Sequence, residues 1–325
     1  MKKRLVVQGR LSDAQLAKLN DLFEVDELSK TTKLDAPENL ALLAQAHGII
    51  GSGLAITPQL LDAAPNLEVI ATVSVGYDNI PVDELTKRGI MLCNTPDVLT
   101  ETTADTGFAL IMATARRVVE LAEWVKADKW QASIGPALFG SDVHGKTLGM
   151  VGFGRIGQAV ARRGALGFGM QVLYSNASPK PDLENELGAQ RRELNELLSE
   201  ADFVCVTVPL TAETEHLIGA QQFALMKPSG IFINIARGKV VDESALIQAL
   251  ENGVIQAAGL DVFAQEPLAA SSSPLPKMSN VVALPHIGSA THETRDAMAQ
   301  RAVDNIRLAL QGERPISLVN EETYR

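Results

Sequence analysis

Short apolar runs alternate with amphipathic segments over residues 4–95 of the chain. Aliphatic clusters too short for a helix predict buried strands at 5–7, 48–50, 69–73 and 90–92. Apolar residues at helical spacing predict helices at 13–23, 37–45 and 82–88. Alternation of this kind is typical of a parallel sheet with helices packed on its faces.

A longer helix is predicted next, over 100–126, because Leu110, Ile111, Val118 and Leu121 share one face at helical spacing. An irregular stretch over 133–145 follows. A second strand–helix series then begins at Lys146, with strands predicted at 147–151, 171–174, 203–208, 231–234, 257–261 and 281–284.

The last predicted helix, 292–310, has no strand of its own and can pack back on the first series. A chain of 325 residues also exceeds the size at which single cores stop growing, about 250–300 residues. We therefore predict an α/β protein with two Rossmann-like domains. Residues 1–98 and 288–325 would form a discontinuous outer domain around an inserted, doubly wound domain of residues 99–287.

Charge and cysteine content narrow the functional classes. The net charge of −10 argues against nucleic-acid and anionic-membrane partners, since both are polyanions. No apolar stretch approaches the length of a membrane span. Cys93 and Cys205 lie in apolar, strand-like runs, which favours buried thiols over a disulfide or a metal site. We expect a cytoplasmic protein without a metal.

The run Gly152-Phe153-Gly154-Arg155-Ile156-Gly157 matches the dinucleotide-binding pattern G-x-G-x-x-G. A predicted strand at 148–151 precedes it and a predicted helix at 156–166 follows, which is the context that this motif requires. Gly152 permits the tight turn, Gly154 lets the backbone approach a pyrophosphate, and Gly157 allows close packing of helix on strand. The alternative reading is an ordinary glycine turn.

The loop after the next strand bears on which coenzyme binds. NAD-specific folds usually carry an acidic residue there, whereas this chain reads Tyr174-Ser175-Asn176-Ala177-Ser178-Pro179-Lys180. Ser175, Asn176 and Ser178 can donate hydrogen bonds to a 2′-phosphate, and Lys180 or Arg155 can add positive charge. The pattern favours NADPH over NADH, although turn residues that accept both coenzymes remain an alternative.

Among the histidines of the chain, position selects one as an acid–base candidate. His47, His144, His216 and His292 lie before a strand, in a loop, on a charged face and at a helix start, where structural or surface roles are usual. His286 instead follows directly after a buried strand. The carboxyl ends of parallel strands are where open α/β sheets bind ligands, so His286 is the predicted acid–base residue.

Arg237 and Glu266 likewise lie in segments that follow predicted apolar strands, at 231–234 and 257–261. Either residue alone is more simply read as a surface arginine or a loop glutamate. Three polar residues that follow successive strands of one sheet are harder to explain as surface residues.

Four segments resemble the D-isomer-specific 2-hydroxyacid dehydrogenase family: G-F-G-R-I-G (152–157), N-I-A-R-G (234–238), G-L-D-V-F-A-Q-E-P (259–267) and P-H-I-G-S-A-T (285–291). The likeness covers essentially the whole chain. S-V-G-Y-D-N (74–79), T-E-T (100–102) and T-A-R-R (114–117) resemble its bacterial glyoxylate/hydroxypyruvate and 2-ketogluconate reductase branch. That branch usually has a basic residue where this chain has Ala177.

The resemblance implies a flavodoxin-like substrate domain, an NAD(P)-binding domain, and reduction of glyoxylate, hydroxypyruvate or 2-ketogluconate to D-2-hydroxy acids. Arg237 would bind the substrate carboxylate and carbonyl oxygen, His286 would protonate that oxygen, and Glu266 would orient His286. Further substrate contacts would come from Ser52, Gly53, Leu54, Val75 and Gly76. Coenzyme contacts beyond the glycine motif would be Ser175, Asn176, Ser178, Pro209, Thr214, Ala236, Asp261 and Gly288.

Two other functions fit the same residues. Phosphite dehydrogenases share the catalytic trio, and non-catalytic NAD(H)-sensing proteins of this fold can retain it. Formate dehydrogenases pair their histidine with glutamine, where this chain has Glu266. The apolar character of 100–126 and 133–145 suggests a homodimer formed through the nucleotide-binding domain, as in the family.

Overall fold

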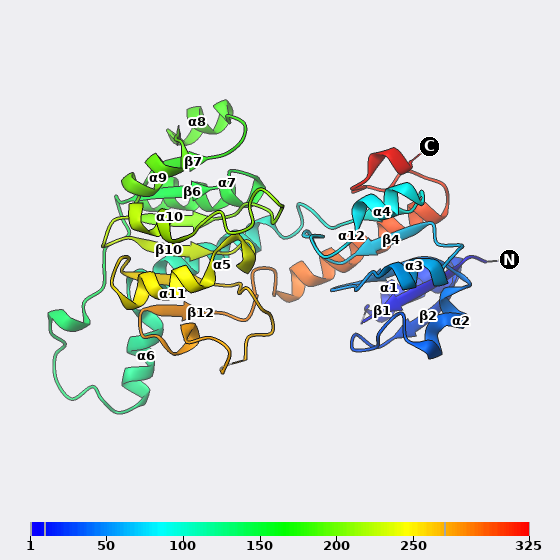
Figure 1. The fold of residues 1–325 in the computed structure, drawn as a ribbon, viewed down its shortest axis with the longest axis horizontal. Helices are drawn as coiled ribbons and strands as arrows, with labels where there is room; N and C mark the ends of the chain where they lie inside the picture. The colour runs from blue at the N-terminus through cyan, green and yellow to red at the C-terminus, as the bar shows by residue number, and fades with distance from the viewer. Residues whose placement is uncertain (1, 10, 270, 325) are drawn as a thin grey trace. The chain divides into compact units, whose positions relative to one another are not determined.

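The chain forms two compact units in the computed structural model, which describes residues 2–9, 11–269 and 271–324. Met1–Leu99 and Ala290–Arg325 make up the first unit, and Thr100–Ser289 makes up the second. The second unit is thus inserted into the sequence of the first. Each unit is an α/β structure with a parallel sheet (Figure 1).

The sheet of the first unit has the strand order β2-β1-β3-β4-β5, which is the flavodoxin-like order. Its strands are β1 (Arg4–Gln8), β2 (Glu24–Leu28), β3 (Ala46–Gly51), β4 (Val69–Thr72) and β5 (Met91–Cys93). Its helices are α1 (Asp13–Leu22), α2 (Leu40–Leu43), α3 (Pro58–Ala63), α4 (Val82–Lys87) and α12 (His292–Leu310), with 3₁₀ turns η1 (Pro37–Asn39) and η6 (Glu321–Thr323).

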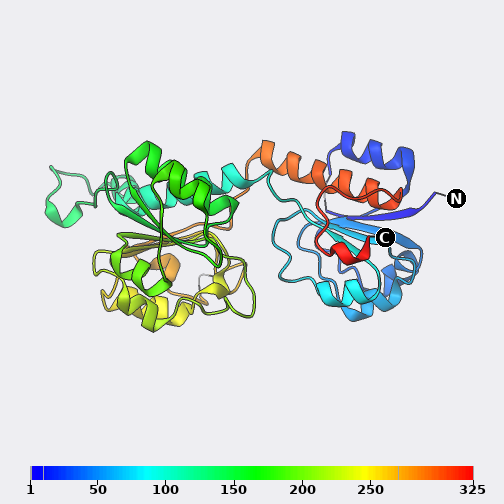
Figure 2. The same cartoon turned by 90° about the horizontal axis from the view of Figure 1, so that it is seen from above.

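Helices cover both faces of this sheet (Figure 2). The C-terminal helix α12 packs with α1 on one face, as expected for a terminal helix without its own strand. The close approach of α12 to β3 depends on Gly48 in β3, because a Cβ at this position would lie 3.1 Å from the Ile306 side chain and 3.2 Å from the Leu310 side chain. The sequence pattern missed β2, an acidic edge strand whose burial is only partial.

The sheet of the second unit has the strand order β12-β11-β10-β9-β6-β7-β8, with β6 in the interior and the order reversing between β6 and β9. Its strands are β6 (Thr147–Val151), β7 (Gln171–Ser175), β8 (Gln190–Arg191), β9 (Phe203–Val206), β10 (Ile231–Asn234), β11 (Ala257–Leu260) and β12 (Val281–Ala283). This is the doubly wound order expected of a dinucleotide-binding domain.

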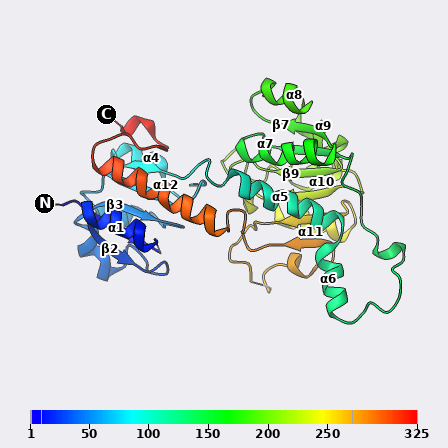
Figure 3. The same ribbon diagram turned by 180° about the vertical axis from the view of Figure 1, so that it is seen from behind.

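Its helices are α5 (Thr100–Ala115), α6 (Val118–Lys126), α7 (Arg155–Arg162), α8 (Pro181–Leu187), α9 (Leu194–Glu200), α10 (Ala220–Leu225) and α11 (Glu243–Glu251). Shorter turns are η2 (Pro136–Leu138), the π-helical η3 (Arg163–Gly167), η4 (Gly238–Val240) and η5 (Leu275–Lys277). Helices α5 and α7 lie side by side on one face of the sheet (Figure 3), while α9, α10 and α11 cover the other.

The single helix predicted over 100–126 is wrong, because two helices, α5 and α6, occupy this stretch. Arg117 adopts a left-handed backbone with φ of 53° between them. Its guanidinium donates to the carbonyl oxygens of Ala137 (2.6 Å) and Phe139 (3.4 Å) and pairs with Glu120. Contacts to a loop twenty residues further along the chain therefore fix the break between α5 and α6. The sequence at the break contains no glycine or proline that would predict it.

Both cysteines are fully buried and free, as predicted. Burial raises the pKa of the Cys93 and Cys205 thiols to about 12, so both stay protonated and unreactive at neutral pH. Within the ranges that the structure describes, none of the helices combines the length and apolar character needed to cross a bilayer.

Candidate functional site

Arg237, Glu266 and His286 follow β10, β11 and β12, which are neighbours in the sheet of the second unit. Because the strands are parallel, their carboxyl ends meet at one edge, and the three loops lie together there. The structure therefore brings together the three residues that the sequence selected.

Glu266 and His286 are in direct contact. Oε2 of Glu266 lies 2.7 Å from Nδ1 of His286, and its Oε1 accepts the Phe263 N–H at 2.9 Å. The His286 side chain is 46% exposed, and its Nδ1 is engaged by the carboxylate, so Nε2 is the ring nitrogen left for a ligand. The carboxylate thus fixes the orientation of the imidazole.

Electrostatics keep Glu266 ionised. Partial burial pushes the pKa of its carboxyl upward, but the hydrogen bonds from His286 and Phe263, and the positive charges of His286 and Arg237, outweigh burial. The net result is a pKa below the usual value for glutamate. Glu266 therefore presents a negatively charged acceptor to Nδ1 of His286.

The backbone at His286 is left-handed, with φ of 55°. Non-glycine residues rarely adopt this conformation, and such outliers cluster at functional sites. The following turn is held by Asp261, which is 1% exposed. Its Oδ1 accepts the Ile287 N–H at 2.7 Å and its Oδ2 accepts the Gly288 N–H at 2.8 Å. Burial raises the pKa of Asp261 despite these bonds.

The Arg237 turn is fixed by its own backbone and by Asn234, a buried polar residue at the end of β10. Asn234 accepts the Ala236 N–H at 3.0 Å and donates to the Arg237 carbonyl oxygen at 3.0 Å. The Arg237 guanidinium donates to the Ala236 carbonyl oxygen at 2.7 Å.

Gly238 decides how closely the Arg237 and Glu266 loops approach each other. A Cβ on Gly238 would lie 1.8 Å from the carbonyl carbon of Phe263, so only glycine fits. This backbone-to-backbone contact joins the loop of Arg237 to the loop that carries Glu266. Sequence reasoning missed the roles of Gly238 and Asn234, although a glycine next to the arginine and a polar residue ending an apolar strand were visible signals.

The glycines of the 152–157 motif serve different purposes. Gly152 has a φ of 93°, and a Cβ on Gly157 would lie 2.5 Å from the Gly152 carbonyl oxygen, so packing within the protein explains both. Gly154 has an ordinary φ of −74°, and a Cβ there would meet nothing within 4 Å. Space is therefore open at the start of α7, where first-turn amides have no intrahelical acceptor. A coenzyme diphosphate fits this opening.

Replacing Gly154 with alanine is expected to weaken NADPH and NADH binding by about tenfold or more, because the methyl group would occupy the space that the diphosphate needs. The melting temperature should hardly change, since the methyl group meets no protein atom. Fluorescence titration with both coenzymes tests this. Gly135→Ala is the control, because Gly135 is equally unobstructed and lies outside the motif. Unchanged coenzyme affinity in Gly154→Ala would contradict the assignment.

The loop after β7 is tied to the glycine turn. The Gly152 N–H donates to the Ser175 carbonyl oxygen at 2.9 Å, and the Phe153 N–H donates to Oδ1 of Asn176 at 3.0 Å. The Asn176 side-chain nitrogen also donates to the Ser178 carbonyl oxygen at 2.9 Å. Part of the hydrogen-bonding capacity expected for a 2′-phosphate is therefore used within the loop.

The remaining predicted coenzyme residues lie in neighbouring loops at the same sheet edge. Pro209 and Thr214 follow β9, with the Thr214 hydroxyl donating to the Pro209 carbonyl oxygen at 2.6 Å. Arg155 and Ile156 open α7. Ala236 and Gly288 lie after β10 and β12, in the loops of Arg237 and His286.

The predicted substrate residues Ser52, Gly53, Leu54, Val75 and Gly76 belong to the first unit. They follow β3 and β4, which are adjacent strands, and so share one edge of that sheet. The Leu54 side chain is fully buried in its own unit, which leaves only its backbone for a substrate contact.

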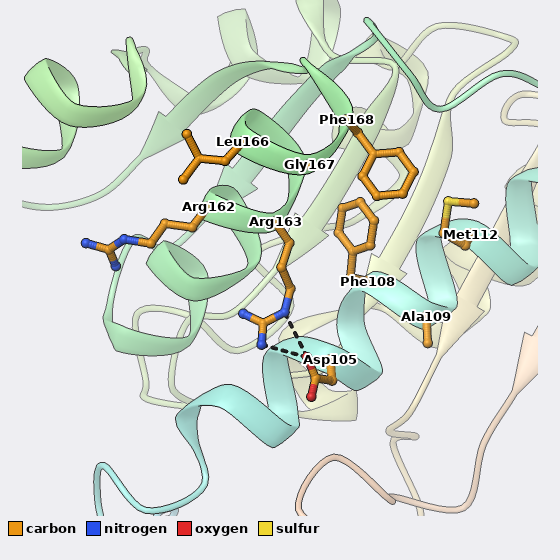
Figure 4. Close-up of a pocket in the computed structure, with 9 residues that line it drawn as sticks. All are labelled: Asp105, Phe108, Ala109, Met112, Arg162, Arg163, Leu166, Gly167 and Phe168. Atoms are coloured by element: carbon orange, nitrogen blue, oxygen red, sulfur yellow. Dashed lines mark hydrogen bonds and ion pairs between the residues drawn. The ribbon is translucent and has the colours of Figure 1, made fainter.

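A hollow of ≈520 Å³ on the second unit contains none of the predicted residues. Figure 4 shows it between α5 and the α7–η3 segment, with Phe108 and Phe168 facing each other at a centroid distance of 4.7 Å. Arg163 pairs with Asp105 at 2.6 Å on its rim. Its walls are mostly apolar, and it lacks the acid–base groups of the Arg237 region.

The sequence profile described as "D-isomer specific 2-hydroxyacid dehydrogenase, NAD binding domain" matches residues 108–288. The chain belongs to the D-isomer-specific 2-hydroxyacid dehydrogenase family. It is accordingly an NAD(P)-dependent oxidoreductase that acts on the CH–OH group of 2-hydroxy acids.

Named relatives of this dehydrogenase include glyoxylate/hydroxypyruvate reductase B of Escherichia fergusonii, 53% identical over 325 residues and covering all of both chains. Among solved structures, the NADPH-dependent glyoxylate/hydroxypyruvate reductase of Sinorhizobium meliloti in complex with NADP and malonate is 34% identical. Its TM-score is 0.89, with 100% of this chain and 99% of that chain covered. A glyoxylate reductase from Paecilomyes thermophila is 31% identical, with a TM-score of 0.89 and 99% of each chain covered.

Proposed function

We propose that this dehydrogenase reduces small 2-keto acids, with glyoxylate and hydroxypyruvate as substrates and 2-ketogluconate as a further candidate, and that it prefers NADPH. The observation that carries the proposal is the arrangement of Arg237 beside the hydrogen-bonded pair Glu266–His286, with Glu266 held ionised. The names of the bacterial relatives support the choice of substrates.

In this proposal, Arg237 binds the substrate carboxylate and polarises its carbonyl through a rigid fork of donors. His286 donates the proton on Nε2 to the carbonyl oxygen, while Glu266 holds Nδ1 and stabilises the imidazolium. The backbone amides of Val75 and Gly76 are proposed to bind the substrate carboxylate, and the 52–54 loop is proposed to line the substrate pocket. Reduced nicotinamide, when bound, supplies the hydride.

The coenzyme residues proposed are the 152–157 motif together with Ser175, Asn176, Ser178, Pro209, Thr214, Ala236, Asp261 and Gly288. A preference for NADPH is supported by the absence of a carboxylate in Ser175–Lys180, since an acidic residue there would repel a 2′-phosphate. The proposed location is the cytoplasm, whose reducing conditions suit two free, buried thiols.

Steady-state assays with both coenzymes and a panel of 2-keto acids test the function. We expect turnover of glyoxylate and hydroxypyruvate, with kcat/KM higher for NADPH than for NADH. Adding phosphite and NAD⁺ to the panel separates phosphite oxidation from keto-acid reduction. Coenzyme binding without turnover of any substrate would instead identify a non-catalytic sensor and overturn the proposal.

We further propose a homodimer formed through the second unit. None of the residues of helix α6 is buried, and Val118 at its start is exposed. Trp130 and Phe139 are exposed in the segment that follows α6. Exposed apolar side chains of this density mark interaction surfaces. Light scattering is expected to give twice the chain mass, and a monomeric mass at micromolar concentration would reject the dimer.

A further inference from the structure

Strand β8 places a basic side chain next to the loop after β7. This short edge strand lies parallel to β7, with Arg191 opposite Tyr174 in the register. The Nη2 group of Arg191 donates to the carbonyl oxygens of Asn176 (3.1 Å) and Ala177 (3.3 Å). The guanidinium is therefore anchored at the loop itself, although Arg191 lies fourteen residues further along the chain.

Most of the donor capacity of this guanidinium is unused by the protein. An arginine carries five N–H donors, and only Nη2 of Arg191 makes hydrogen bonds within the described part of the chain. Over the same described residues Arg191 has no acidic partner, and the residue is exposed. Arg192 beside it differs, because its Nε contacts Glu200 at 3.1 Å and its Nη2 contacts Gln190 at 2.8 Å.

The loop that anchors Arg191 lies next to the glycine turn of the 152–157 motif. Ser175 and Asn176 are hydrogen-bonded to Gly152 and Phe153, so this loop borders the glycine turn. In doubly wound folds the end of the strand after the glycine turn contacts the coenzyme ribose, and an arginine there accommodates a 2′-phosphate. The loop itself supplies Ala177 at a position where a basic side chain would serve this purpose.

We propose that Arg191 binds the 2′-phosphate of NADPH and is the main determinant of coenzyme preference in this enzyme. The inference rests on the proposed preference for NADPH. Anchoring by two carbonyl oxygens holds the guanidinium in place before the ligand arrives, which lowers the entropy lost on binding. A charged, hydrogen-bonded contact with phosphate is among the stronger polar interactions in proteins.

Calorimetric titration of the full-length chain with adenosine 2′,5′-bisphosphate and with 5′-AMP isolates the 2′-phosphate from the rest of the coenzyme. We expect Arg191→Gln to weaken adenosine 2′,5′-bisphosphate binding by about ten- to thirtyfold and to leave 5′-AMP binding unchanged. Glutamine keeps a donor for the carbonyl oxygens of the loop but removes the charge. The difference should shrink as ionic strength rises.

Arg192→Gln is the matched control, since it removes an adjacent positive charge that is already paired with Glu200. It should alter binding of neither nucleotide. Steady-state kinetics complete the test: Arg191→Gln should raise KM for NADPH by a similar factor and leave KM for NADH and kcat unchanged.

Three results would overturn the inference. If the parent enzyme prefers NADPH and Arg191→Gln keeps that preference, Arg191 is not the determinant, and the proposed function stands. Equal loss of both nucleotides would show that Arg191 only shapes the loop. If the parent enzyme shows no preference for NADPH, both the inference and the proposed coenzyme preference fail.

Discussion

His286→Ala is expected to lower kcat for keto-acid reduction by about 10³-fold, because it removes the proton donor. Coenzyme affinity should stay within about twofold of the parent value. The imidazole is exposed, and within the described residues its hydrogen bond is to Glu266, so its removal disturbs no packed core. Stopped assays at high enzyme concentration measure the residual rate, and nicotinamide fluorescence measures binding.

His216→Ala is the matched control for this variant. Both histidines have a left-handed backbone, with φ of 55° at His286 and 53° at His216, so alanine carries the same conformational cost at either position. His216 lies outside the proposed site, and its variant should retain full activity. Turnover by His286→Ala within tenfold of the parent rate would remove His286 from the mechanism.

The same kinetic assays applied to Glu266→Gln test the role of Glu266, the hydrogen-bond partner of His286. Glutamine can still hydrogen-bond Nδ1 of His286, but it brings no negative charge to stabilise the imidazolium. We expect a loss of kcat smaller than that of His286→Ala, because the ring stays hydrogen-bonded while the charge of its partner is removed. A Glu266→Gln variant with parental kcat would indicate that Glu266 acts only by orienting the ring.

Arg237→Ala is expected to lower kcat/KM for glyoxylate by about 10³-fold, with both a higher KM and a lower kcat. Two charge-assisted hydrogen bonds to the substrate would be lost, at roughly 1.5–3 kcal/mol each. Arg237→Lys should recover only part of the activity, because an ammonium group cannot reproduce the planar fork. Steady-state kinetics over a wide range of keto-acid concentration separate the two effects.

Lys239→Ala controls for the loss of positive charge two residues away on an exposed side chain. Its kinetics should match those of the parent enzyme. Thermal unfolding of Arg237→Ala is also needed, because the arginine donates to the Ala236 carbonyl oxygen within its own turn. A folded Arg237→Ala variant with parental kcat/KM would exclude Arg237 from substrate binding.

The fold class could be predicted because its determinants are local. Short apolar runs identified most of the strands of both sheets, and apolar residues at helical spacing identified several of the helices. The glycine motif with its flanking elements identified the dinucleotide-binding unit. His286 could be selected by elimination and by its position after an apolar strand, whereas Arg237 and Glu266, which also follow strands, took their roles from the family resemblance. In a parallel sheet that position alone brings residues of neighbouring strands to one edge.

Other features depend on contacts between residues that are distant in the sequence. The helix predicted over 100–126 breaks at Arg117 because that side chain binds the 137–139 segment. The need for glycine at 238 comes from the backbone of Phe263, twenty-five residues away. Arg191 reaches the loop of Asn176 only because the short strand β8 pairs with β7.

The sequence by itself determined the α/β class, the glycine motif and the choice of His286, since residue type and spacing encode burial and local geometry. The roles predicted for Arg237 and Glu266 came from the family resemblance. The tertiary structure decided how those candidates are held: the 2.7 Å contact of Glu266 with His286, the Asp261 bonds to the turn after His286, and the anchoring of Arg191. Spacing along the chain cannot specify these features, because each is a distance between loops that only sheet order and side-chain packing fix.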